Sequence, residues 1–142
     1  MNDEMKFQFV DSNILVYAYD NTQGDKNRKA ISLLENLWKT GAGCLSVQVL
    51  QEFYYNITRK SAKPLSPIEA AQVIEDFSDW IIHRPGLRDV LAAIQLLQRH
   101  NISFWDAMIL RSAQQCNCSR LWTEDLSDGQ KYEDVTVINP FA

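Results

Sequence analysis

Four acidic residues interrupt or border apolar stretches of this 142-residue sequence. Asp11 follows FQFV, Glu52 lies within VLQEFYYN, Asp106 lies within SFWDAMIL, and Asp125 comes two residues after RLWT. Each has an ordinary explanation when taken alone, such as a helix cap, a helix-dipole contact, a turn or a solvent-facing position. Taken together they predict a site for Mg²⁺ or Mn²⁺, because converging carboxylates repel one another unless a hard cation lies between them.

Such a site suits the hydrolysis of phosphodiester bonds. A metal ion makes its bound water easier to deprotonate and neutralises the charge that develops on the phosphate and the leaving oxygen. We expect Asp11, Asp106 and Asp125 to be metal ligands. Glu52 is expected to bind a second ion or to orient the attacking water.

The positions of these acids depend on strands that alternate with helices. Apolar and β-branched runs predict strands at 7–10, 43–46, 120–123 and 134–140, and 80–84 is either a strand or the exit from a helix. Helical periodicity and caps predict helices at 14–18, 26–39, 47–60, 67–77, 88–99 and 104–115. Ser12 or Asn13 is expected to cap the first helix and Asp25 the second.

This alternation indicates one α/β domain over residues 1–142 with a mainly parallel sheet. In such a sheet, residues that follow strands and residues in first helical turns share one rim. Ser66, Pro67 and Glu69 form a predicted capping box. The run from 66 to 99 leaves its contribution to the sheet open.

Composition narrows the class of protein. The net charge of −4 argues against simple electrostatic binding of nucleic acid, although four metal-bound carboxylates would leave the remaining charges balanced. Three cysteines, including Cys116 and Cys118, fit core or surface thiols in a reducing compartment better than a zinc site or a disulfide framework. The sequence contains no long apolar run and no N-terminal signal pattern, so we expect a cytoplasmic protein without a membrane segment.

Four segments taken in order, FVDSNILVYAYD, SVQVLQEFYYNITR, SFWDAMILRSA and LWTEDLSDGQ with VTVINPF, resemble the PIN-domain family and within it the VapC-type toxins. The resemblance implies a three-layer α/β sandwich with a central, mainly parallel sheet flanked by helices. It also implies a magnesium- or manganese-dependent ribonuclease, often a homodimer, that is held inactive by a small cognate antitoxin.

Within this resemblance, the family's acids correspond to Asp11, Glu52 and Asp106, and Asn13 and Thr123 correspond to the polar residues that accompany them. Thr123 is expected to hydrogen-bond a carboxylate or a backbone group. The fourth acid is Glu124, Asp125 or Asp128; the family's Thr-x-Asp pattern selects Asp125, with Asp128 assisting from the loop.

Basic and aromatic residues suggest how RNA would bind. Arg59, Lys60 and Lys63 follow the helix that carries Glu52 and are expected to contact RNA, whereas Lys26, Arg28 and Lys29 fit an ordinary solvated helix surface. Trp105, Tyr54 and Tyr55 could stack on bases or pack in the core, and none is assigned to the substrate.

Three other functions compete with a toxin. A haloacid-dehalogenase phosphatase needs a second aspartate two residues after the first, where this chain has Asn13. A non-catalytic module that binds RNA or a protein partner would not need the complete acidic set. An RNA-processing nuclease outside a toxin–antitoxin system would have the same catalytic residues, so the sequence leaves it open.

Overall fold

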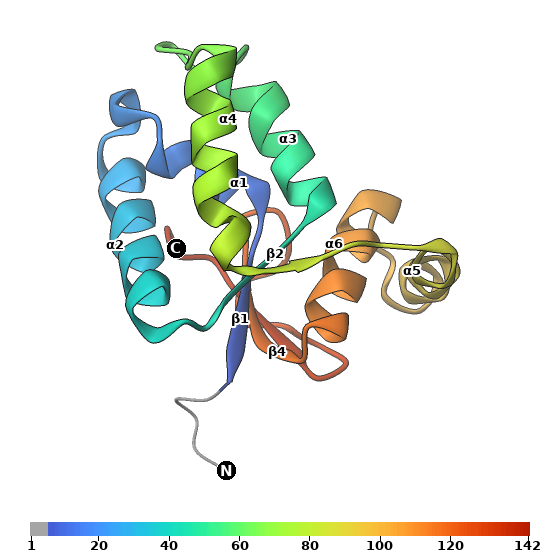
Figure 1. The fold of residues 1–142 in the computed structure, drawn as a ribbon. Coiled ribbons are helices and arrows are strands. Elements are labelled where there is room, and N and C mark those ends of the chain that lie inside the picture. The colour runs from blue at the N-terminus through green and yellow to red at the C-terminus, as the bar shows by residue number, and fades with distance from the viewer. Residues whose placement is uncertain (1–5) are drawn as a thin grey trace.

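The computed structural model describes residues 6–142, which form a three-layer α/β sandwich (Figure 1). Its sheet has the order β3-β2-β1-β4-β6-β5, and every pair is parallel except β5 with β6. The strands are β1 (Phe7–Val10), β2 (Gly43–Ser46), β3 (Ile81–His83), β4 (Cys118–Trp122), β5 (Lys131–Tyr132) and β6 (Val135–Ile138). This confirms the expected fold class.

Six α-helices cover the two faces of the sheet. They are α1 (Ser12–Ala18), α2 (Asp25–Thr40), α3 (Val47–Ile57), α4 (Pro67–Asp76), α5 (Leu87–His100) and α6 (Phe104–Gln115), with short 3₁₀ turns η2 (Asn21–Gln23) and η3 (Phe77–Asp79). In Figure 1, α2 and α4 lie on one side of the strands and α5 and α6 on the other. The sheet is therefore enclosed on both faces, as parallel sheets require.

Local signals placed most elements well. The capping box of α4 is present: the Ser66 N–H donates to the Glu69 carboxylate, and the Glu69 N–H donates to the Ser66 hydroxyl. Ser46 and Ser103 cap α3 and α6 through their side chains. Asn101 adopts a left-handed conformation, with φ of 55°, and ends α5 as expected.

Two predicted caps were wrong. Asp11 itself caps α1, so neither Ser12 nor Asn13 does, because the carboxylate accepts a hydrogen bond from the Ser12 N–H. Gly24 takes the N-cap position of α2, and Asp25 lies inside the first helical turn. The stretch 80–84 contains the edge strand β3. The two-residue strand β5 was not predicted.

The central strands are buried and carry the core. Phe9, Val10, Leu45, Leu121 and Val137 are fully buried between the helical layers. The same core includes Cys44, Cys116 and Cys118, which are free thiols. This agrees with the prediction that the cysteines are core or surface thiols. This packing fixes the ends of β1 and β4, where the acidic residues begin.

Among residues 6–142, none of the helices has the length and apolar character needed to cross a lipid bilayer. The predicted absence of a signal pattern concerns mainly residues 1–5, which lie outside the described residues.

Candidate active site

Asp11 lies at the carboxyl end of β1, which has β2 on one side and β4 on the other. Its N–H donates to the Trp122 carbonyl at 3.0 Å, which continues the β1–β4 pairing to this point. One carboxylate oxygen accepts from the Ser12 N–H at 2.7 Å and the other from the Thr123 hydroxyl at 2.8 Å. The side chain is only 4% exposed, so Asp11 is both a helix cap and a buried acid facing the end of the sheet.

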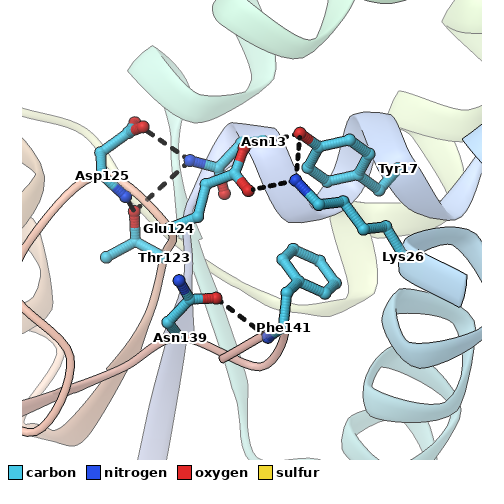
Figure 2. A network of polar contacts seen from close by, with 8 residues as sticks. All are labelled: Asn13, Tyr17, Lys26, Thr123, Glu124, Asp125, Asn139 and Phe141. Atoms are coloured by element: carbon cyan, nitrogen blue, oxygen red, sulfur yellow. Dashed lines mark hydrogen bonds and ion pairs between the residues drawn. The ribbon is translucent and has the colours of Figure 1, made fainter.

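Thr123 joins the ends of β1 and β4. Besides donating to Asp11, its hydroxyl accepts from the Asp125 N–H at 3.1 Å and from the Asn13 amide at 3.4 Å. Asn13 Nδ2 also donates to Asp125 Oδ2 at 3.0 Å (Figure 2). Both supporting residues predicted from the sequence therefore contact predicted acids, and Thr123 has the expected hydrogen-bonding partners.

Glu52 and Asp106 come from two helices that start at this end of the sheet. Glu52 Oε1 accepts from the Ser12 hydroxyl at 3.1 Å, which ties α3 to the start of α1. Asp106 lies in the first turn of α6, where its N–H donates to the capping Ser103 hydroxyl at 3.1 Å. A carboxylate in a first turn is favoured by the helix dipole.

The four carboxylates act on one another electrostatically. Burial, opposed by hydrogen bonds and reinforced by Asp125 and Glu52, raises the pKa of Asp11 from 3.8 to about 7. Burial also raises the pKa of Glu52, with contributions from Asp125 and Asp106, and that of Asp106, with a contribution from Asp125. The structure thus brings the four predicted acids within electrostatic range, and a hollow of about 530 Å³ opens beside Asp106 and Asp125.

The candidates for the fourth acid point in different directions. Glu124 is bound by Lys26 Nζ at 3.1 Å and by the Tyr17 hydroxyl at 2.6 Å (Figure 2). Asp128 accepts from the Asn139 N–H at 2.8 Å. Asp125 accepts from Asn13 and contributes to the raised pKa values of Asp11, Glu52 and Asp106, which favours it as the fourth acid.

Comparison with known proteins places the chain in a family. Residues 9–127 match the family model described as PIN domain. The chain belongs to the PIN domain family. Comparison of the sequence with curated proteins finds no significant match.

Solved structures agree on the fold of this PIN domain. A toxin–antitoxin complex from Klebsiella pneumoniae superposes with a TM-score of 0.66 at 20% identity, over 94% of this chain and 97% of that chain. VapC20 of Mycobacterium tuberculosis, described as a sarcin–ricin loop cleaving toxin, superposes with a TM-score of 0.62 at 19% identity. The match covers 80% of this chain and 86% of that chain. VapBC2 of Rickettsia felis, bound to a promoter DNA fragment, superposes with a TM-score of 0.64 at 20% identity. The match covers 92% of this chain and 96% of that chain.

The predicted RNA-binding residues of this PIN domain follow the C-terminal end of α3. Arg59 lies over the Tyr55 ring at 4.6 Å, and Lys63 borders a separate hollow beside Tyr19 and Pro64. Among the described residues, no hydrogen bond or ion pair joins Arg59, Lys60 or Lys63 to the four acids. Lys26, read from the sequence as part of a solvated surface, is paired with Glu124.

The donor groups at the site can be judged by what a divalent cation requires. Within residues 6–142, no three His, Cys, Asp or Glu side chains converge tightly enough to form a preassembled metal centre. The donor chemistry nevertheless fits a hard cation, since four carboxylates face one region and the buried Asn13 Oδ1 accepts no hydrogen bond from the described residues.

Sequence reasoning missed several residues that support the site. Gln48 lies one helical turn before Glu52, and its amide donates to Glu52 Oε2 at 3.4 Å; this four-residue spacing was a detectable signal. Ser12 and Tyr17 had no such signal, because their partners Glu52 and Glu124 are 40 and 107 residues away along the chain.

Proposed function

We propose that this PIN domain is a metal-dependent endoribonuclease and the toxin of a toxin–antitoxin module. The observation that carries the proposal is the meeting of Asp11, Glu52, Asp106 and Asp125, from four separate segments, at one end of the sheet. Carboxylates gathered in this way suit a hard cation and phosphodiester chemistry. Proteins of the same fold include a toxin–antitoxin complex and a toxin described as cleaving the sarcin–ricin loop.

Asp11, Asp106 and Asp125 would hold Mg²⁺ or Mn²⁺, which supplies charge neutralisation and an acidified water when bound. Thr123 fixes Asp11 through its hydroxyl, and Asn13 holds Asp125 at 3.0 Å. Glu52 lies beside Ser12 and Gln48, where it would bind a second ion or accept a proton from water. These hydrogen bonds restrict the carboxylates before substrate arrives.

RNA would reach the acids across a surface to which Arg59, Lys60 and Lys63 add positive charge, and Asp128 would assist from the loop after Asp125. The protein is proposed to act in the cytoplasm, as a homodimer, with a small cognate antitoxin as its inhibitor. Support for the antitoxin comes from the structural neighbours in complex with theirs.

The test is cleavage of a mixed cellular RNA preparation by the purified chain with magnesium or manganese. A chelator and the Asp106→Asn variant should each abolish cleavage. Asp79→Asn, which changes an exposed carboxylate on η3, is the matched control and should cleave like the wild type. The fragment ends would identify the target.

Metal-independent RNA binding without cleavage would replace this proposal with a non-catalytic module. The protein could also cleave RNA although its expression does not arrest growth and its gene has no antitoxin gene beside it. That result would support the ribonuclease assignment and contradict the toxin assignment. An Asp106→Asn protein with full metal-dependent activity would contradict the assignment of the site.

A further inference from the structure

Another hollow, of about 380 Å³, is lined by neighbours of two of the four acids. It opens between the start of α3, the loop that joins β3 to α5, and the first turns of α6. Its walls combine Trp105, Met108 and Pro85 with the polar side chains of Gln48, Gln51 and Arg84. The volume lies within the range of about 300–1,000 Å³ that is typical of small-ligand pockets.

The hollow shares a wall with the acidic site. Gln48 Nε2 donates to Glu52 Oε2 and to the Trp105 carbonyl, each at 3.4 Å. Trp105 is also the residue immediately before Asp106. A ligand in this hollow would therefore lie beside two of the four proposed catalytic acids.

One wall is an aromatic surface. The Trp105 side chain is 63% exposed, and its only ring contact within residues 6–142 is an edge contact with Phe104 at 5.0 Å between centroids. An exposed indole is costly in water and offers a flat face on which a base can stack. Met108 and Pro85 add apolar surface at the same hollow.

Two polar side chains at this hollow, Gln48 and Arg84, have groups without a partner among residues 6–142. Both acceptors near Gln48 face its nitrogen, so Oε1 points elsewhere; it is buried and has no hydrogen-bond partner among the described residues. Arg84 is exposed and forms no ion pair in residues 6–142, so its charge is available to a phosphate.

We propose that this hollow, the base pocket (Gln48, Arg84, Pro85, Trp105 and Met108), binds one unpaired nucleobase of RNA next to the phosphate that is cleaved. The base stacks on Trp105, and the adjoining phosphate meets Arg84. The assignment rests on the proposed function, which places the cleaved phosphate at the four acids. Binding of an unpaired base explains how an acidic site would select single-stranded RNA.

The test measures binding separately from cleavage. Fluorescence anisotropy in chelator compares a labelled oligoadenylate with an abasic oligomer of the same length and backbone charge. The wild type should bind oligoadenylate about tenfold more tightly, the effect expected for stacking of one base. Trp105→Ala should abolish this preference, and Trp105→Phe, which keeps an aromatic face, should retain most of it.

Two further variants complete the design. Arg84→Gln should weaken both oligomers and lower the salt dependence while preserving the preference for bases. Ile68→Ala, which removes an 83% exposed apolar side chain on α4, is the control and should behave like the wild type.

Equal binding of the two oligomers by the wild type would overturn the base pocket, as would a base preference that survives in Trp105→Ala. A shift of Trp105→Ala from dimer to monomer, together with no base preference in the wild type, would assign the hollow to a second copy instead. A base preference without any metal-dependent cleavage would support the pocket and reject the nuclease, so the two failures are distinguishable.

Discussion

Replacing Asp11 by asparagine removes a carboxylate that is unstable in its charged form at neutral pH. The side chain is 4% exposed, and burial is the largest cause of the rise in its pKa from 3.8 to about 7. The Ser12 N–H and the Thr123 hydroxyl favour the charged form, but they only partly offset burial. At neutral pH and without metal, the ionisation of Asp11 therefore opposes folding.

The sign follows from proton binding. The folded chain binds this proton more tightly than the unfolded chain, so the stabilisation is complete below about pH 4 and is lost as the pH rises through about 7. The rise in pKa corresponds to about 4 kcal/mol, at about 1.4 kcal/mol per pKa unit. Asparagine does not ionise, but its amide replaces an oxygen that accepts from Thr123, which costs about 1 kcal/mol.

The two effects predict a crossing of stabilities. In chelator, the free energy of unfolding of Asp11→Asn should exceed that of the wild type by about 3 kcal/mol near pH 8 and fall below it by about 1 kcal/mol below about pH 4. Urea denaturation across this pH range measures both curves. Asp79→Asn, an exposed carboxylate, is the control and should follow the wild type at every pH.

Magnesium provides the second half of the assay. It should stabilise the wild type, because the cation removes the cost of the buried charge, and it should leave Asp11→Asn nearly unchanged while cleavage is abolished. Parallel stability curves for the two proteins would refute the claim that buried Asp11 is strained by its charge. Equal stabilisation of both by magnesium would refute its role as a ligand.

Three other experiments test the framework of the fold. A double-mutant cycle of Lys26→Met and Glu124→Gln should give a coupling of about 0.5–1 kcal/mol in urea denaturation; zero coupling would mean that this pair does not anchor the loop that carries the fourth acid. Ser66→Ala should lower the free energy of unfolding by about 1 kcal/mol with unchanged RNA cleavage, since it removes a helix cap remote from the acids; no loss of stability would contradict the capping box. Gly43→Ala should destabilise by about 1–3 kcal/mol, because its Cβ would overlap the Trp80 ring, and a neutral result would show that the ring moves aside.

Short-range signals explain what the sequence predicted. The capping box at Ser66 and Glu69 and the left-handed stop at Asn101 depend on contacts within a few residues. Runs of alternating strands and helices are sufficient to indicate a parallel sheet, and residues after its strands must meet at one rim. Asp11 and Asp106 could be selected in this way because one follows a strand and the other lies in a first helical turn, and the family's Thr-x-Asp pattern selected Asp125 from the segment after β4.

Long-range contacts decided the rest. The different orientations of Asp125 and Glu124 depend on Asn13 and Tyr17, which are 112 and 107 residues from their respective partners. The edge strand β5 pairs only with β6 and leaves no pattern in two residues. The base pocket likewise forms where three segments meet, so its free acceptor and exposed indole cannot be read from spacing.

The sequence by itself determined which residue types are available for metal and phosphate chemistry and which helices and strands carry them. Only the tertiary structure decided which carboxylate faces the others, because hydrogen bonding and burial depend on neighbours that packing supplies. The rise in the pKa of Asp11 to about 7 is the clearest example, since it arises mainly from the removal of water around a side chain that the sequence alone could not show to be buried.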